Sequence, residues 1–443
     1  VVLTEGDRVA RQVLLVAAYD SQLKWVMTLA DEFAAQGWRY TVVVPTDVRH
    51  SLSADQIAAA AGGIGIERFR WAELLRRSRL ADCVVLALQG TLVARFTDEL
   101  ELLRRESPSD HEPVVVTGWV GIIIEKLVAG YLDRAGSDVI AVNSADNLRE
   151  FTEAGRRLGI PPDNLLLSGL PLLPDRPPPP RTGRIRTVVF ADQPTVPEAR
   201  WDRAYVYQRL LDHAALHPDR EVLLKPRHRP GEGTFHVMRD APESIVQRLG
   251  PMPPNFAITH ERITDLLTRT DLLLTVSSTA GLEAIGRGVR TAFVADLGVH
   301  EKHGNQVLVR SGLLATFDDI DADRIPVVDP AWLDDVFVGG GVRPVARIVN
   351  RVTELTAVPP PARPARRVAA GPYLSGRVAV RSTRARMPEI AQDPSDSTAN
   401  APARRFAPVL RALARRGDHV LRGLLPARWH RAAVNGWYRL RIG

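Results

Sequence analysis

The chain has 443 residues, 45% of them hydrophobic, which is enough for two or three domains of ordinary size. Its one cysteine, Cys83, cannot form a disulfide within the chain, and no apolar run reaches the roughly 18 residues of a spanning helix. These features exclude a disulfide-rich secreted domain and an integral membrane protein. They predict a protein of the reducing cytoplasm.

The positive charge is concentrated at the end of the sequence. Residues 359–443 hold 17 arginines and four acidic residues, a net charge of +13. The whole chain carries +7, so residues 1–358 carry a net charge of −6. An acidic body argues against a nucleic-acid-binding core. Composition predicts a disordered linker over 358–402 and a basic amphipathic tail over 403–443. Arginines beside Trp429 and Trp437 suit peripheral contact with an anionic membrane; a partner-binding or disordered tail is the alternative.

The first half of the chain alternates short apolar runs with segments of helical period. We expect a helix over about 22–36 and a further helix over 147–158. The expected strands are 13–18, 40–44, 83–88, 114–116, 139–142 and 165–167. A proline run at 177–180 then predicts a connector between domains.

The second half repeats this alternation. The expected strands are 187–191, 221–224, 272–276 and 291–294, and the expected helices lie near 205–213, 263–268, 282–286 and 343–357. Strands separated by helices indicate βαβ units and parallel sheets. We therefore predict an α/β protein with two Rossmann-like domains facing a cleft, 1–175 for the acceptor and 185–357 for the donor. Ligands of such sheets bind outside the carboxyl ends of the strands.

A hydroxyl-rich loop follows the expected strand 272–276. Ser277, Ser278 and Thr279 precede the small residue Gly281 and the start of a helix, an arrangement that offers N–H and hydroxyl donors to a phosphate. An ordinary helix N-cap is the alternative. A capping box on Thr279 would need its acid at position 282, so Glu283 is available for another role, such as accepting from ribose hydroxyls.

A basic loop follows the expected strand 221–224. Lys225, Arg227 and His228 stand between two prolines that stiffen the segment. Lysine is rare in this chain, occurring only at positions 24, 126, 225 and 302, which favours a site that needs a compact ammonium. Such donors suit the phosphate of a leaving group, to which His228 could give a proton; a solvated basic turn is the alternative.

The basic loop and the S-S-T string with its following glutamate resemble the motifs of bacterial polysialyltransferases and lipid-linked ulosonic-acid transferases. CDP-glycerol glycerophosphotransferases carry a similar pair, and over its body the chain is similar to an uncharacterised actinobacterial glycosyltransferase family. The resemblance implies the two-Rossmann (GT-B) fold, with a histidine loop and a serine loop on the phosphate of a cytidine nucleotide donor. It assigns those roles to His228, to Ser277–Thr279 and to Glu283, although this chain has Arg-His-Arg-Pro where those enzymes have His-Pro.

The first expected strand leads into Asp20 and Ser21, with Lys24 one turn into the helix. No dinucleotide-binding glycine fingerprint occurs there. An inverting transferase needs a carboxylate base that faces the donor, and Asp20 is suitably placed. The alternative is that Asp20 or Ser21 caps the helix.

Glu125 is the second candidate base. It follows the strand 114–116 in a loop where Gly118 and Gly121 would allow the backbone to approach a ligand closely. Glu125 could equally pair with a structural arginine, and we rank Asp20 above it.

No metal ion and no cofactor are predicted. His300 and His303 lack a third ligand nearby, so His303 and Asn305 are interpreted as polar contacts to the donor. The acidic string 319–323 is interpreted as a solvated turn.

The sequence thus favours an inverting, metal-independent, sialyltransferase-like enzyme that transfers an acidic sugar from a CMP-linked donor to a cell-envelope polysaccharide at the inner face of the plasma membrane. The expected partners are the nucleotide-sugar donor, a glycan or lipid-linked acceptor and anionic lipid, but no nucleic acid. Alternatives are a CDP-glycerol glycerophosphotransferase, a UDP-sugar or GDP-sugar transferase, a nucleotide-sugar epimerase, and a non-catalytic nucleotide-sugar-binding scaffold.

Overall fold

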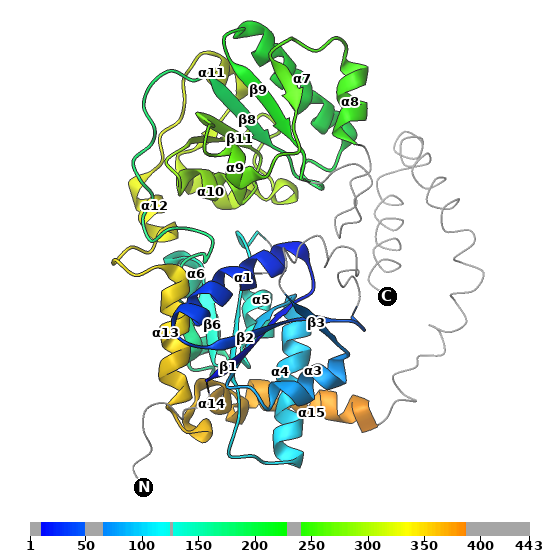
Figure 1. Cartoon of the computed structure of the whole chain (residues 1–443), viewed down its shortest axis with the longest axis vertical. Helices are drawn as coiled ribbons and strands as arrows, with labels where there is room; N and C mark the ends of the chain where they lie inside the picture. The colour runs from blue at the N-terminus through cyan, green and yellow to red at the C-terminus, as the bar shows by residue number, and fades with distance from the viewer. Residues whose placement is uncertain (1–9, 49–64, 125–126, 228–240, 387–443) are drawn as a thin grey trace, which may run out of the picture. The chain divides into compact units, whose positions relative to one another are not determined.

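The computed structural model describes residues 10–48, 65–124, 127–227 and 241–386. These residues build two parallel sheets, each with helices on its faces (Figure 1). None of the described helices is both long and apolar enough to cross a membrane.

The first sheet has the order β3-β2-β1-β4-β5-β6-β7. Its strands are β1 (Gln12–Ala17), β2 (Arg39–Pro45), β3 (Ile66–Phe69), β4 (Cys83–Ala87), β5 (Val114–Gly118), β6 (Val139–Val142) and β7 (Leu165–Leu167). The helices between them are α1 (Asp20–Ala35), α3 (Trp71–Ser78), α4 (Gly90–Glu106), α5 (Leu127–Arg134) and α6 (Ala145–Arg157). The central strands are continuous runs of buried valine, leucine and alanine, because helices cover both faces of a parallel sheet.

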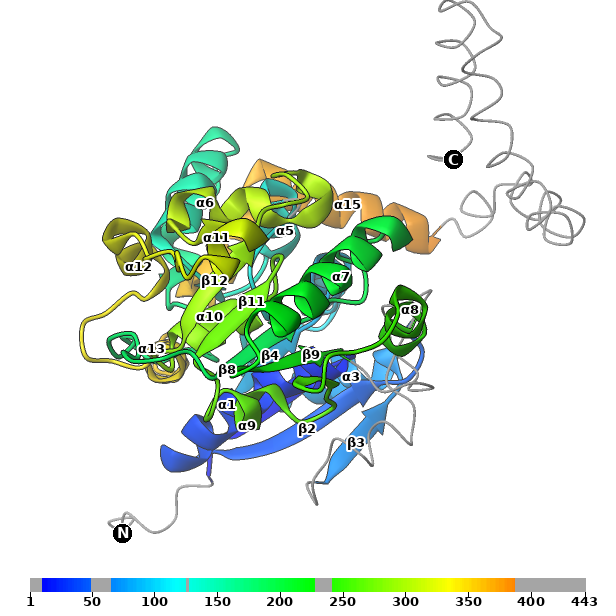
Figure 2. The same cartoon turned by 90° about the horizontal axis from the view of Figure 1, so that it is seen from above.

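The second sheet has the order β10-β9-β8-β11-β12-β13. Its strands are β8 (Thr187–Ala191), β9 (Glu221–Lys225), β10 (Phe256–Ile258), β11 (Leu272–Thr275), β12 (Arg290–Val294) and β13 (Leu314–Ala315). Its helices are α7 (Arg200–Leu216), α8 (Pro242–Leu249), α9 (Ile263–Leu266), α10 (Ala280–Ile285), α11 (Phe317–Asp321) and α12 (Pro330–Val336). The apolar face of α7 packs on β8 and β9 (Figure 2).

Both sheets reverse their strand order beside the first strand, between β1 and β4 and between β8 and β11. This is the doubly wound order of a Rossmann domain, and ligands of such sheets bind at the carboxyl edge near the reversal. The prediction of two Rossmann-like α/β domains is confirmed.

The helix α13 (Pro344–Thr356) departs from the expected domain boundaries. It was expected to close the second domain, but its apolar side chains at 345, 348, 349 and 352 join the core of the first sheet, where α13 packs against α1. The periodicity of a segment shows which of its faces is apolar, but not which sheet that face covers. The chain therefore returns to its first lobe after the second is complete.

Part of the expected disordered linker is helical. The helices α14 (Pro364–Ala370) and α15 (Pro372–Arg386) pack on the first lobe, where Arg366 pairs with Glu101 at 2.6 Å and Arg377 with Asp98 at 2.8 Å. Both carboxylates are buried, so these arginines neutralise charges that would otherwise be costly. Some of the charge attributed to a tail thus belongs to the fold. Residues 387–443 lie outside the described residues.

The packing of α15 predicts a stability difference within one helix. Leu374 is 3% exposed in a core cluster with Tyr131 and Phe151, whereas Val380 is 56% exposed. We expect Leu374→Ala to cost about 2–5 kcal/mol, because it leaves a cavity. Val380→Ala should stay within about 0.5 kcal/mol of the parent. Urea unfolding of the full chain measures both; equal, small effects would contradict the docking of α15.

Candidate functional site

The loops after β8, β9 and β11 leave neighbouring strands at the carboxyl edge of the second sheet. Gln193, which follows β8, connects its own loop to the loop after β11. Its side-chain oxygen accepts the Ser277 N–H at 2.9 Å, and its amide nitrogen lies 3.3 Å from the Ser277 hydroxyl. The expectation from sequence did not include Gln193, because a lone glutamine after a strand gives no distinctive signal.

Hydrogen bonds to neighbouring loops and within the loop itself hold the serine loop in place. Ser277 is buried, and its hydroxyl donates to the carbonyl of His303 at 2.5 Å. Ser278 accepts the N–H of Ala280 at 3.2 Å, so it performs part of the capping that the alternative reading assigned to this string. The Ser277 side chain therefore holds the loop in place, which leaves Ser278 and Thr279 as the hydroxyls of this string that are only half-buried.

A buried arginine fixes the loop after β8. One guanidinium nitrogen of Arg203, on α7, donates to both carboxylate oxygens of Asp192, at 2.8 and 2.7 Å. Arg203 also donates to the carbonyls of Gln193, Pro194 and Pro197 at 2.8, 3.1 and 2.9 Å. Burial raises the pKa of Asp192, and the guanidinium of Arg203 opposes that rise. This pairing gives the loop a single geometry. The aspartate directly after the strand was the one available sequence signal.

The basic loop begins at the end of β9. Lys225 donates to the carbonyl of Pro226 at 2.6 Å, and Arg227 is exposed at the start of the loop. Although the Arg227 side chain is exposed, the protein around its guanidinium group lowers its pKa by desolvation, and the charges of Asp20 and Glu283 oppose that shift. The charges of Arg227 and Glu283, on two different loops, therefore affect each other's pKa. His228 lies outside the described residues.

Glu283 lies in the first turn of α10 and is half-buried. Burial raises the pKa of its carboxyl group, and the positive charges of Arg287, Lys24 and Arg227 counteract part of this effect. Arg287 is 3.9 Å away, too far for a close ion pair. The carboxyl group therefore retains the capacity to accept hydrogen bonds from a ligand.

The first lobe contributes Asp20 and Lys24, which form an ion pair at 3.0 Å on α1. Tyr19, not Asp20, is the N-cap residue, and no side chain caps this helix end. Ser21 is half-buried beside them. The negative charge of Asp20 opposes the lowering of the Arg227 pKa, and the positive charge of Lys24 opposes the raising of the Glu283 pKa. Opposite charges from the two lobes therefore affect one another.

The loop after β5 approaches the second lobe. A Cβ atom at Gly121 would lie 2.6 Å from the Thr279 hydroxyl oxygen, and one at Gly118 would lie 3.1 Å from the ring of Trp25. A side chain at Gly121 would require Thr279 to shift, and one at Gly118 would require its neighbours to move by a few tenths of an ångström, so protein atoms approach both positions, where the sequence predicted a ligand. Further along the chain, Gln306 donates to the carbonyl of Ile124 at 3.2 Å. Glu125 lies outside the described residues.

The loop after β12 supports the serine loop. Asn305 accepts the His300 N–H and donates to the carbonyl of Gly298, both at 3.0 Å, so its amide closes this loop on itself. His303 is buried, and burial with the nearby Lys302 lowers the pKa of its imidazole. A direct contact of either residue with a donor stays a prediction.

The acidic string 319–323 is not a solvated turn. Thr316 and Asp319 form a capping box at the start of α11, Asp321 pairs with Arg209 at 2.8 Å, and Asp323 pairs with Arg220 at 2.7 Å. The pairing partners come from α7 and from the turn before β9, positions that sequence spacing does not reveal.

The raised pKa of Glu283 predicts how stability depends on pH. The folded state binds this proton more tightly than the unfolded state, so the group's contribution is present at low pH. It is lost as the pH rises from the ordinary range of a glutamate through the raised pKa. We expect Glu283→Gln to melt with the wild type near pH 4 and above it at pH 7.

Thermal unfolding at both pH values measures this difference. Glu301→Gln, at an exposed glutamate of the same lobe, is the control and should follow the wild type throughout. A Glu283→Gln variant that melts below the wild type at pH 7 would show that the surrounding cations outweigh burial.

Comparisons with known proteins agree with this fold. Residues 13–355 match the family described as "Putative glycosyltransferase (DUF6716)". No curated protein matches the chain. Among solved structures, S. aureus MnaA in complex with UDP superposes with a TM-score of 0.50 at 11% identity, over 79% of this chain and 97% of that one. This likeness concerns the fold alone.

Two further structures show weaker likeness. The UDP-GlcNAc 2-epimerase from Neisseria meningitidis, bound to UDP-GlcNAc, has a TM-score of 0.47 at 11% identity, over 78% of this chain and 98% of that one. The lipopolysaccharide outer core galactosyltransferase WaaB has a TM-score of 0.44 at 10% identity, over 78% and 99%. The family match spans most of the chain and both sheets. The chain therefore belongs to this glycosyltransferase family and is an enzyme of that class.

Proposed function

We propose that this protein is an inverting, metal-independent glycosyltransferase that moves an acidic sugar from a CMP-linked donor to a cell-envelope glycan. One observation carries the proposal: the loop that holds Gly121 in the first lobe closely approaches Thr279 in the serine loop of the second lobe, and nearby the charges of Asp20 and Lys24 act on the pKa values of Arg227 and Glu283. A transferase needs such a set, with cations for the departing phosphate and a carboxylate for the acceptor proton.

The phosphate side of the reaction uses a cation from each lobe, Arg227 of the second and Lys24 of the first. Arg227 and Lys24 supply positive charge where the bond between sugar and phosphate breaks and negative charge develops on the phosphate oxygen. Gln193 and Arg203 already fix the neighbouring serine loop and the loop after β8. Donors held in place before the reaction stabilise that charge without the cost of reorganisation. His228, next to Arg227 in the chain, is the proposed additional donor to the phosphate.

Asp20 is the proposed base. The acceptor hydroxyl oxygen forms its bond to the anomeric carbon while the bond from that carbon to the phosphate oxygen breaks, and the hydroxyl proton passes to Asp20. Because attack and departure occur on opposite faces in one displacement, the anomeric configuration inverts. Asp20 is 52% exposed, so an acceptor can reach it.

Glu283 is the proposed acceptor for donor hydroxyl groups. Its carboxyl group is half-buried beside the serine loop, and each hydrogen bond from a hydroxyl would replace the water that burial has removed. Ser278 and Thr279 are the proposed phosphate contacts of that loop.

The identity of the nucleotide rests on the resemblance of the basic and serine loops to those of cytidine-nucleotide enzymes. CDP-glycerol, UDP-sugars and GDP-sugars are the competing donors, and UDP is the first to test because the S. aureus protein of similar fold was solved with it. Peripheral membrane contact through residues 403–443 belongs to the same proposal. The arginines proposed for this contact do not include Arg366 and Arg377, which pair with Glu101 and Asp98.

The test is release of nucleotide from CMP-, CDP-, UDP- and GDP-activated donors by the full chain, with the anomeric configuration of the product determined by NMR. We expect CMP from a CMP-linked acidic sugar. Asp20→Asn should lower turnover about 10²- to 10⁴-fold. Its donor affinity, measured by thermal shift, should stay within about twofold of the wild type, because the base does not hold the phosphate.

Asp31→Asn is the matched control, since Asp31 is an exposed aspartate on the same helix and should leave turnover unchanged. Release of UDP or GDP alone would overturn the CMP assignment. Full turnover by Asp20→Asn would overturn the base assignment, and release from none of the donors would contradict a nucleotide-sugar mechanism.

A further inference from the structure

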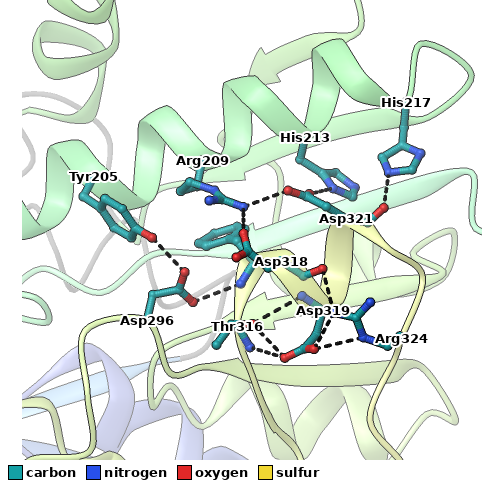
Figure 3. A network of polar contacts seen from close by, with 11 residues as sticks. Tyr205, Arg209, His213, His217, Asp296, Thr316, Asp318, Asp319, Asp321 and Arg324 are labelled. Carbon is teal, nitrogen blue, oxygen red and sulfur yellow. Dashed lines mark hydrogen bonds and ion pairs between the residues drawn. The ribbon is translucent and has the colours of Figure 1, made fainter.

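The side of α7 that faces α11 brings together two histidines and an aspartate (Figure 3). His213 and His217 lie four residues apart at the end of α7, so their side chains fall on one face of the helix. Asp321 is the last residue of α11. One potential ligand atom from each residue lies within 4.8 Å of the other two.

These three residues are already ordered by their mutual contacts. His213 Nδ1 lies 2.6 Å from a carboxylate oxygen of Asp321, and His217 Nε2 lies 3.0 Å from the Asp321 carbonyl oxygen. The two imidazole centroids are 4.6 Å apart. His213 is buried, whereas His217 and Asp321 are half-buried. Little conformational entropy therefore remains to be lost when an ion binds.

The surrounding charge favours a cation. Asp318, Asp321 and Asp323 face Arg209 and Arg220, which leaves one negative charge in excess when the histidines are neutral. The carbonyl end of α7, where His217 is the C-cap residue, adds the negative end of a helix dipole. Arg209 contacts the carboxylate oxygen of Asp321 that does not face His213, so it can orient the carboxylate without occupying the ligand position.

We propose that His213, His217 and Asp321 form a zinc site that fastens α7 to α11. Two imidazole nitrogens and one carboxylate oxygen form a donor set typical of Zn²⁺, and a water molecule would complete the tetrahedron. Bonds of about 2.0–2.1 Å place the ligand atoms of such a site about 3.4 Å apart. Ligand atoms that now lie up to 4.8 Å apart must close by up to about 1.4 Å, which the half-buried His217 and Asp321 allow. The proton between His213 and Asp321 leaves as the metal binds.

The site would join the two helices away from the residues proposed for sugar transfer. His213 lies ten residues along α7 from Arg203, about 15 Å at the rise of an α-helix. Zinc would therefore fix one end of the helix whose other end holds the loop after β8, without taking part in sugar transfer. The inference does not depend on the proposed donor.

The experiment uses the full chain freed of metal by EDTA and then titrated with Zn²⁺. We expect one tight equivalent by calorimetry and a rise in Tm of several degrees, because an ion that binds only the folded state stabilises it. Co²⁺ in place of Zn²⁺ should give the visible absorption of a four-coordinate site. His217→Ala should abolish the rise in Tm and weaken binding at least 100-fold.

The comparison that decides is the zinc-induced change in Tm of each variant, not its starting stability. His260→Ala is the control, because His260 is a half-buried histidine that pairs with Glu243 elsewhere in the lobe, and it should respond to zinc as the wild type does. Asp321→Asn should also reduce the zinc-induced rise in Tm. It provides a test of a second ligand that does not require a substitution at the buried His213. An equal response by His217→Ala and the wild type, or none by the wild type, would overturn the proposal.

Discussion

All strands within each sheet run in the same direction, and the rest of the site depends on this constraint. It places the loops after β1 and β5 at one edge of the first sheet and those after β8, β9 and β11 at one edge of the second. Residues distant in sequence, such as Asp20 and Arg227, come within electrostatic reach only because these two edges meet. The contact of Gly121 with Thr279 marks the same meeting point.

The second lobe combines rigid support with an electrostatically strained group. Arg203 binds three carbonyls and Asp192 inside the lobe, and Gln193, one of the residues it holds, accepts a hydrogen bond from Ser277 in the serine loop. Glu283, by contrast, sits where burial disfavours its charge. A protein tolerates such a group where a ligand uses it, and the ordered loops around Glu283 keep its surroundings fixed.

Sequence patterns were sufficient for local structure and for the position of the loops. The strand 187–191 was predicted with the bounds that β8 has, because a buried parallel strand is a continuous apolar run. The sequence patterns did not reveal which elements pack against one another. The helix α13 has an apolar face that either sheet could cover. The arginines of α14 and α15 have the composition of a charged tail, and only the structure shows that two of them pair with buried carboxylates. Ser277 shows the same limit within the site, since its hydroxyl meets a carbonyl 26 residues away.

A disulfide between the lobes tests the central claim, that the carboxyl edges of the two sheets meet at this site. A Cβ atom at Gly121 would lie 3.7 Å from that of Thr279, within the range of a disulfide, and the native Cys83 is buried. The double variant Gly121→Cys, Thr279→Cys should form an intramolecular disulfide under mild oxidation, which reductant reverses, whereas neither single variant can form one. Two cysteines that both react with maleimide but never join would contradict the account.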